Sequence, residues 1–239
     1  MRGDAAAIIV AGGQGKRFGG RVRKQYLSLS GRPLLWWAVN AFDRSRSVGA
    51  VVLVVPREDL SRARRSFSRW KVRKPLHIVA GGVTRAGSVR HGLAAVPPGF
   101  RWVAVHDAVR PLVTPALIEN VLRAARAHRA AIAACPSKDT VKWASSRQKI
   151  LRTLPRKDVW LAQTPQAFER RLLERAHQKG KGLDATDDSF LVERLGVQVK
   201  LVAGPPENLK VTIPMDLKVA RMILSASPTR QTSGGSPLS

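Results

Sequence analysis

The residues best suited to chemistry follow the first apolar run of the chain, residues 5–11. Glycine lets a backbone approach a ligand closely, and the N–H groups of such a loop can surround an anion. Cations beside that loop suit a triphosphate whose α-phosphorus gains charge in a transition state. The alternative is a loop whose cations contact only water. The candidate residues here are Ala11, Gly12, Gly13, Gly15, Arg17 and Lys24.

Two well-known phosphate-binding loops do not match this segment. A P-loop requires glycine where Val10 stands and a serine or threonine where Arg17 stands. The dinucleotide fingerprint requires a third glycine where Phe18 stands. The next predicted strand also ends at Pro56 and not at an acidic residue. These departures argue against a P-loop NTPase and against a Rossmann dehydrogenase.

The elements that must position this loop alternate between strands and helices. Strand-like runs are predicted at 5–11, 50–55, 76–79, 102–111, 130–135 and 197–204. Helical patterns are predicted at 31–42, 57–70, 166–180 and 214–224, with another helix starting at Thr114. Residues 80–96 are predicted to form a Gly-rich turn that enters a helix. This alternation predicts an α/β fold, with a mostly parallel twisted sheet flanked by helices on both faces. In such folds the site lies at the carboxyl ends of the strands.

Two further segments fall outside the alternation. The runs "DTVKW" and "KILRTL" predict a β-hairpin, and we expect residues 137–158 to form a protruding arm. Residues 225–239 are rich in serine, glycine and proline, which predicts a disordered tail. We therefore expect one domain over residues 1–224.

The composition favours a soluble protein with a strongly positive field. The formal net charge is +26, from 42 lysines and arginines against 16 acidic residues. That field attracts polyanions and supports a rival class, a basic nucleic-acid-binding protein with 57–70 as its best segment. No helix-turn-helix, RRM or zinc-finger signature favours this class, so we do not expect a nucleic-acid partner.

The cellular setting follows from what the sequence lacks. Cys135 is the single cysteine, which excludes a disulfide within the chain and fits the reducing cytoplasm. No apolar run is long enough to span a bilayer, and we interpret the apolar N-terminal run as a strand and not as a signal peptide. We therefore expect a cytoplasmic protein without a membrane partner.

Several separated blocks carry a resemblance to a known family. They are "AGGQGKRF" with "KQYL", "AGGVTRAGSV", "VHDAVRP", "AQTPQAF" with "ATDDS", and "ENLKVT". In this order, up to about residue 224, they resemble the 2-C-methyl-D-erythritol 4-phosphate cytidylyltransferase family of the non-mevalonate isoprenoid pathway. The resemblance implies a Rossmann-like nucleotidyltransferase fold. It also implies Mg²⁺-dependent transfer of CMP from CTP to methylerythritol phosphate, with release of pyrophosphate.

The resemblance further implies which residues contact CTP. It assigns this role to Ala11, Gly12, Gly13, Gly15, Lys24, Gly81, Gly82, Arg85, Ser88 and Asp107. Arg17 and Lys24 would stabilise the α-phosphate in the transition state. Val83 and Gly87 stand where relatives commonly carry acidic residues, which weakens the expectation of CTP selectivity. Taken alone, "AGGVTRAGSV" is typical of an ordinary Gly-rich turn.

The acceptor site is also assigned by the resemblance. Its residues would be Asp107, Arg110, Thr140, Arg156, Thr164, Thr186 and Lys210. Arg156 and Lys210 would act with Arg17 and Lys24 in catalysis, and Asp107 would also lie near Mg²⁺, which the CTP phosphates mainly hold. The arm would reach a partner subunit in a homodimer and supply Arg156 in trans.

Purely structural alternatives remain for these residues. The arm could be an edge hairpin, isolated threonines are usually structural, and His106 is expected to be structural and not a general base. A closely similar family acts on ribitol 5-phosphate, and substrate competition would separate the two acceptors.

Overall fold

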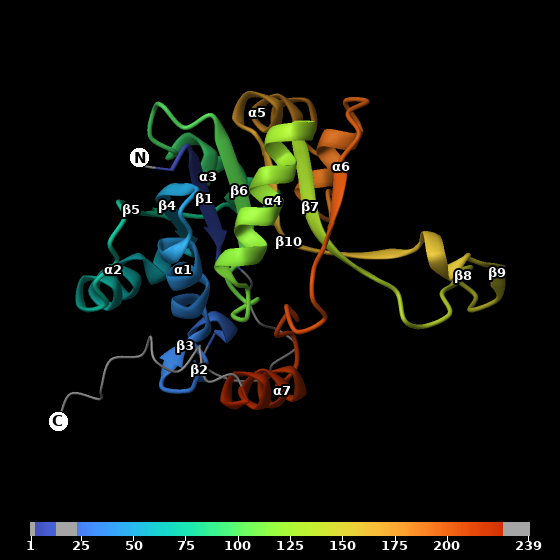
Figure 1. Ribbon diagram of the computed structural model, residues 1–239, viewed down its shortest axis with the longest axis horizontal. Helices are drawn as coiled ribbons and strands as arrows, with labels where there is room; N and C mark the ends of the chain where they lie inside the picture. The colour runs from blue at the N-terminus through green and yellow to red at the C-terminus, as the bar shows by residue number, and fades with distance from the viewer. Residues whose placement is uncertain (1–2, 13–22, 227–239) are drawn as a thin grey trace.

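The computed structural model describes residues 3–12 and 23–226. Its centre is a seven-stranded sheet in the order β11-β7-β10-β6-β1-β4-β5 (Figure 1). The strands are β1 (Ala5–Val10), β4 (Val48–Val55), β5 (Leu76–Ala80), β6 (Trp102–Asp107), β7 (Ala130–Pro136), β10 (Trp160–Glu169) and β11 (Lys200–Ala203). Only β10 runs antiparallel to its neighbours in this sheet, β6 and β7. The predicted α/β fold with a mostly parallel sheet is confirmed.

Helices cover both faces of the sheet. They are α1 (Leu34–Arg44), α2 (Leu60–Arg69), α3 (Arg85–Ala94), α4 (Pro115–His128), α5 (Arg170–Lys179) and α6 (Asp188–Glu193). A further helix, α7 (Pro214–Ser225), packs outside these two faces. Successive side chains of a strand point to opposite faces. Ile9 therefore packs in a core with α1, α2 and α4, whereas Ile8 packs in a second core with α3, α5 and α6. Burial on both faces explains why β1 is a continuous apolar run.

Shorter elements complete the chain near the site. The 3₁₀ helix Lys24–Tyr26 leads into the small ribbon of β2 (Ser28–Leu29) and β3 (Arg32–Pro33). Helix α7 packs against this region through a third apolar cluster that includes Leu29 and Leu217. None of the helices in the described ranges combines the length and the apolar character that a bilayer span requires.

The predicted hairpin is confirmed and forms the end of a long arm. Strands β8 (Lys142–Ala144) and β9 (Ile150–Thr153) pair antiparallel to each other. Figure 1 shows them far from the main sheet, at the end of two extended segments that continue β7 and lead into β10. The arm, residues 137–158, carries exposed apolar side chains, among them Trp143 and Leu151.

The largest error of the sequence interpretation concerns β10. The helix predicted over 166–180 begins only at Arg170, because residues 166–169 form the end of β10 between β6 and β7. Pairing with two neighbouring strands overrides the helical pattern of these residues. Helix α6 was not predicted at all. The predicted strand over 102–111 ends earlier, at Asp107, and residues 227–239 of the predicted tail lie outside the described residues.

A close approach between α3 and β1 gives a first prediction. A Cβ on Gly92 would lie 2.5 Å from Cγ2 of Ile8 and 3.0 Å from Cγ2 of Val54. We expect Gly92→Ala to lower the free energy of unfolding by about 1 kcal/mol, because overpacking outweighs the better helix propensity of alanine. Chemical denaturation measures this. A more stable variant would contradict the close packing.

Candidate functional site

The candidate site lies at the carboxyl ends of β1 and β6. Val10 and Asp107, the last residues of these strands, are register partners. Backbone hydrogen bonds join the end of β1 to the ends of its two neighbours. Ala11 N–H, just after β1, donates to the Val54 carbonyl of β4, and Ala108 N–H, just after β6, donates to the Val10 carbonyl of β1. Parallel strands place such ends at one edge, where ligands of open α/β sheets bind. The predicted position of Ala11 and Gly12 at this edge is therefore found.

The second Gly-rich turn closes around Ser88. The Ser88 hydroxyl accepts a hydrogen bond from Gly82 N–H at 3.1 Å and donates to the Thr84 carbonyl at 3.0 Å. A Cβ on Gly81 would lie 2.8 Å from Ser88 Oγ, and one on Gly12 would lie 3.4 Å from the same atom. Glycines thus bring the turn after β1 and the turn after β5 close to one hydroxyl. This matches the grouping of these residues that the sequence predicted.

The two departures from the expected acidic pattern have different surroundings. Val83 is fully exposed. A Cβ on Gly87 would lie 3.2 Å from the hydroxyl oxygen of Thr84, which caps the N-terminus of α3 by accepting from Gly87 N–H. The turn is therefore closed by the Thr84 cap and the Ser88 hydroxyl without an acidic side chain at either position.

Asp107 is the electrostatic centre of the site. Its carboxylate lies 3.1 Å from Nε of Arg85 and 2.7 Å from Nζ of Lys210. Burial favours the neutral acid, but the positive charges of Arg85 and Lys210 prevail and hold the pKa of Asp107 well below its usual range. Asp107 is therefore an ionised carboxylate with two fixed cationic partners.

Arg85 also joins Asp107 to a second buried carboxylate. Its Nη1 lies 2.7 Å from Oδ2 of Asp188, whose side chain is 1% exposed. Nε2 of His177 lies 2.9 Å from the other oxygen of Asp188. Burial raises the pKa of Asp188, but the interactions with Arg85 and His177 outweigh it and lower this pKa below the ordinary value of 3.8. The Arg85 predicted to contact CTP is thus held by two carboxylates in this structure.

Gln166 of β10 fixes the start of α6 beside this pair. Its Oε1 accepts from the N–H groups of Asp188 at 3.1 Å and Ser189 at 3.3 Å, and its Nε2 donates to Asp187 at 2.8 Å. Thr186, a predicted acceptor ligand, is exposed directly before this fixed helix end. Asp188, His177 and Gln166 were missed from the sequence. The block "ATDDS" was a signal for Asp188, although it was used only for Thr186.

A second network holds the residues that follow β6. The Thr164 hydroxyl accepts from Asp107 N–H at 3.1 Å and lies 2.9 Å from Nδ1 of His106. Burial lowers the pKa of His106 to about 4, so this ring is neutral near neutral pH, as a structural role requires. Arg110 donates from Nη1 to the Asn208 carbonyl at 2.8 Å, close in the chain to Lys210. Thr164, Arg110 and Lys210 therefore belong to the same region as Asp107.

The remaining predicted residues are not joined to Asp107 by any of the contacts described above. Lys24 begins the 3₁₀ helix that packs on α1. Thr140 and Arg156 are exposed on the arm, where Arg156 donates to the Lys138 carbonyl at 3.2 Å. Figure 1 shows that the arm leads away from the ends of β1 and β6 in its own chain. Gly13, Gly15 and Arg17 lie outside the described residues.

The buried pair gives a second prediction. We expect Asp188→Asn to lower the free energy of unfolding by about 3 kcal/mol near pH 7, because it leaves the half-buried Arg85 with one carboxylate partner. A carboxylate whose folded-state pKa is depressed stabilises the protein above its unfolded pKa. The difference between wild type and variant should therefore stay constant above about pH 5 and shrink as the pH falls from about 5 toward 2.

The matched control removes an exposed pair. Glu174→Gln breaks the surface ion pair with Arg170, and we expect a loss below about 0.5 kcal/mol. Denaturant unfolding at several pH values measures both variants. Equal losses, or a constant difference across this pH range, would show that Asp188 has no such stabilising charge.

Comparison with known proteins agrees with this arrangement. The family model of 2-C-methyl-D-erythritol 4-phosphate cytidylyltransferase matches residues 5–226. The enzyme of that name from Pelotomaculum thermopropionicum is 45% identical over 233 residues, which cover 96% of this chain and 98% of the relative. The one from Caldanaerobacter subterraneus is 39% identical, with 92% of this chain and 99% of the relative covered.

Solved structures give the same result. The 4-diphosphocytidyl-2C-methyl-D-erythritol synthase of Anaerococcus prevotii has a TM-score of 0.82 and 30% identity, with 92% of this chain and 98% of that chain covered. The cytidylyltransferase of Thermus thermophilus has a TM-score of 0.73 and 32% identity, with 91% and 98% covered. This chain therefore belongs to the 2-C-methyl-D-erythritol 4-phosphate cytidylyltransferase family of enzymes.

Proposed function

We propose that this protein transfers CMP from CTP to 2-C-methyl-D-erythritol 4-phosphate in isoprenoid precursor biosynthesis. The products are 4-diphosphocytidyl-2-C-methyl-D-erythritol and pyrophosphate. The observation that supports this most directly is the Asp107 carboxylate, held between Arg85 and Lys210 beside two Gly-rich turns. Ligands of open α/β sheets bind at the carboxyl ends of the strands, which supports this edge as the place for CTP and the acceptor.

The nucleotide half of the proposal uses mainly backbone groups. Ala11, Gly12, Gly13 and Gly15 surround the triphosphate, and the turn around Ser88, with Gly81 and Gly82, reads the cytosine edge. Because Arg85 is bonded to Asp107 and Asp188, its contribution is to orient Asp107 toward the nucleotide. Because Val83 and Gly87 stand in place of acidic residues, selection of the base depends on backbone groups and on the Ser88 hydroxyl.

The chemical step is an in-line displacement. An oxygen of the acceptor phosphate forms a bond to the α-phosphorus, and the bond from that phosphorus to the bridging oxygen of pyrophosphate breaks. A phosphate monoester is already anionic, so the step needs no strong base. Arg17 and Lys24 neutralise the charge that develops on the α-phosphate, which is how most such catalysis is achieved.

The described residues do not form a complete metal site by themselves. No three His, Cys, Asp or Glu side chains converge within the described ranges, and Asp107 already has two cationic partners. We therefore propose that Mg²⁺ enters with CTP, held mainly by phosphate oxygens, with Asp107 as a nearby carboxylate. Bound in this way, the ion supplies further charge neutralisation to the triphosphate.

The acceptor half of the proposal needs two subunits. One subunit contributes Asp107, Arg110, Thr164, Thr186 and Lys210, and the arm of its partner contributes Thr140 and Arg156. Exposed apolar side chains on the arm, including Trp143, Ile150 and Leu151, suit burial in a homodimer. The single cysteine is consistent with a cytoplasmic homodimer that needs no disulfide.

Pyrophosphate release from purified protein with Mg²⁺ and CTP tests the reaction. We expect pyrophosphate release with methylerythritol phosphate and none with ribitol 5-phosphate. Pyrophosphate release with only ribitol 5-phosphate would keep the mechanism and change the pathway. No release with either acceptor, in protein shown to be folded, would refute the assignment.

The role of the first loop gives a third prediction. We expect Arg17→Ala and Lys24→Ala each to lower kcat by about 10²–10³-fold, because each removes a cation from the transition state. Thermal melting should show a retained fold. Arg64→Ala, on the exposed face of α2, is the control and should leave turnover unchanged. Normal turnover in both loop variants would refute the charge-stabilisation mechanism.

The composite site gives a fourth prediction. Arg156→Ala and Lys210→Ala should each be nearly inactive. The first variant lacks the cation that the arm supplies, and the second lacks the cation beside Asp107. In a heterodimer of the two variants, one site receives both intact residues. An equal mixture that exchanges subunits should therefore regain about a quarter of wild-type turnover. Mixed dimers that stay inactive would show that Arg156 acts within its own chain.

A further inference from the structure

A cationic groove lies between α1 and α2. It has a volume of about 640 Å³, and its cations are Arg32, Arg44, Arg69, Lys71 and Arg73. Its lining extends from Arg32, just before α1, through Trp36 to Arg44, and faces residues 67–73 at the end of α2 and beyond. None of these residues belongs to the Asp107 site. The groove is therefore separate from the Asp107 site.

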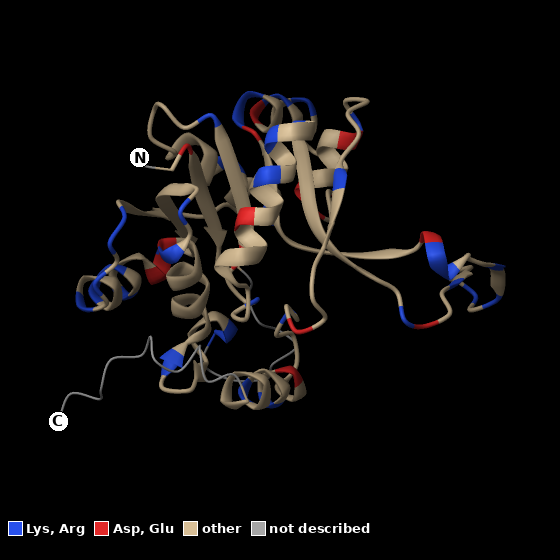
Figure 2. Ribbon diagram, viewed as in Figure 1, with Lys and Arg blue, Asp and Glu red and all other residues tan. Residues whose placement is uncertain are grey.

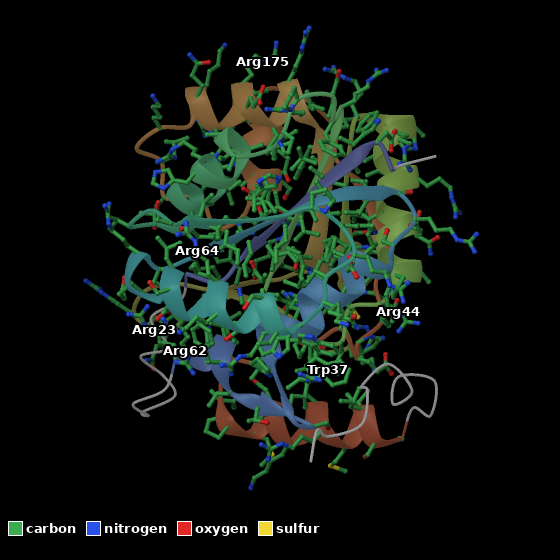
Figure 3. All side chains as sticks on the ribbon, turned by 90° about the vertical axis from the view of Figure 1, so that its left-hand side faces the viewer. Arg23, Trp37, Arg44, Arg62, Arg64 and Arg175 are labelled. Carbon is green, nitrogen blue, oxygen red and sulfur yellow. The ribbon has the colours of Figure 1, made fainter. Side chains whose placement is uncertain are left out.

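The positive side chains of this groove lack carboxylate partners. Asp43 is the one carboxylate in its lining, and it accepts hydrogen bonds from the N–H groups of Arg73 and Lys74, both at 3.0 Å. In the described part of the chain, none of the five cations forms an ion pair with a carboxylate. Figure 2 shows lysine and arginine gathered on α2. In the view of Figure 3, Arg44 is labelled to the right, and Arg62 and Arg64 of α2 are labelled to the left.

Two tryptophans line the same groove. Trp70 is half-buried and packs edge-on against Phe67, with ring centroids 4.9 Å apart. The guanidinium of Arg32 lies 5.3 Å from the ring centroid of Trp36. Cations that follow a phosphate backbone, together with aromatic rings on which bases stack, are the features by which proteins bind single-stranded nucleic acid.

Other polyanionic surfaces fit this groove less well. A lipid surface favours apolar side chains that insert between headgroups. The large exposed apolar side chains of the described residues include none from α1 or α2. We propose that the groove between α1 and α2 binds single-stranded nucleic acid, with phosphates on its five cations and a base against Trp70. This proposal departs from the expectation of no nucleic-acid partner that the sequence motifs gave, because it depends on the groove and not on a motif.

A second groove provides a matched control. It has a volume of about 520 Å³ and is lined by Arg175, Lys179 and Arg194, with aliphatic and no aromatic side chains among its lining residues. The triple variants R69Q/K71Q/R73Q and R175Q/K179Q/R194Q remove the same charge from the protein. A difference between them therefore reports the site and not the overall field.

The experiment is fluorescence anisotropy of labelled 12-nucleotide oligo-rU and oligo-dT with the full chain at several salt concentrations. We expect R69Q/K71Q/R73Q to reduce the slope of log affinity against log salt by about 2, since each lost phosphate contact removes about 0.7. R175Q/K179Q/R194Q should keep the wild-type slope. The ratio of the two oligonucleotide affinities shows whether RNA or DNA is preferred.

Trp70→Leu tests the stacking half of the proposal. We expect it to weaken binding at least about fivefold without changing the salt slope, because stacking on an aromatic ring depends little on salt. Thermal melts confirm that each variant is folded. Equal losses in both triple variants, or Trp70→Leu binding as tightly as wild type, would overturn the proposal.

Discussion

The guanidinium of Arg85 is the interaction on which the site depends. Arg85 is the first residue of α3, and its guanidinium bonds to Asp107 at the end of β6 and to Asp188 at the start of α6. Removing charges from water costs free energy that only well-placed partners recover. Because Asp188 is buried and fixed by Gln166 and His177, Arg85 has a defined position, and through it Asp107 has one too. An ionised carboxylate is thereby held at the sheet edge without a ligand.

The antiparallel strand β10 connects this site to the arm. β10 contributes Thr164, which accepts from Asp107 N–H, and Gln166, which fixes α6. It also pairs with β7, the strand from which the arm departs. The arm is thus the connection between two neighbouring antiparallel strands, and a change in their pairing would move both the acceptor region and the arm. One strand therefore links the residues proposed for the site with those proposed to serve a partner subunit.

Strands with a continuous apolar run, such as β1 and β4, could be predicted from the sequence, because burial on both faces requires that pattern. β10 could not, since its first residues are exposed and its last residues resemble the start of an amphipathic helix. Asp107 was named from the sequence through the family resemblance. Asp188 was missed because its importance comes from burial beside Arg85, which is distant in sequence. The pairing of Arg85 with two carboxylates also gives it a different setting from the direct nucleotide contact expected of it.

A double-mutant cycle on kcat/KM with Arg85→Lys and Asp188→Asn tests most directly whether Asp188 acts through Arg85. If Asp188 serves only to position Arg85, the double variant should be no slower than Arg85→Lys alone. The coupling free energy between the two changes should then exceed about 1 kcal/mol. Losses that simply add would show that Asp188 acts independently of Arg85, and would contradict the role of this buried pair in holding Asp107.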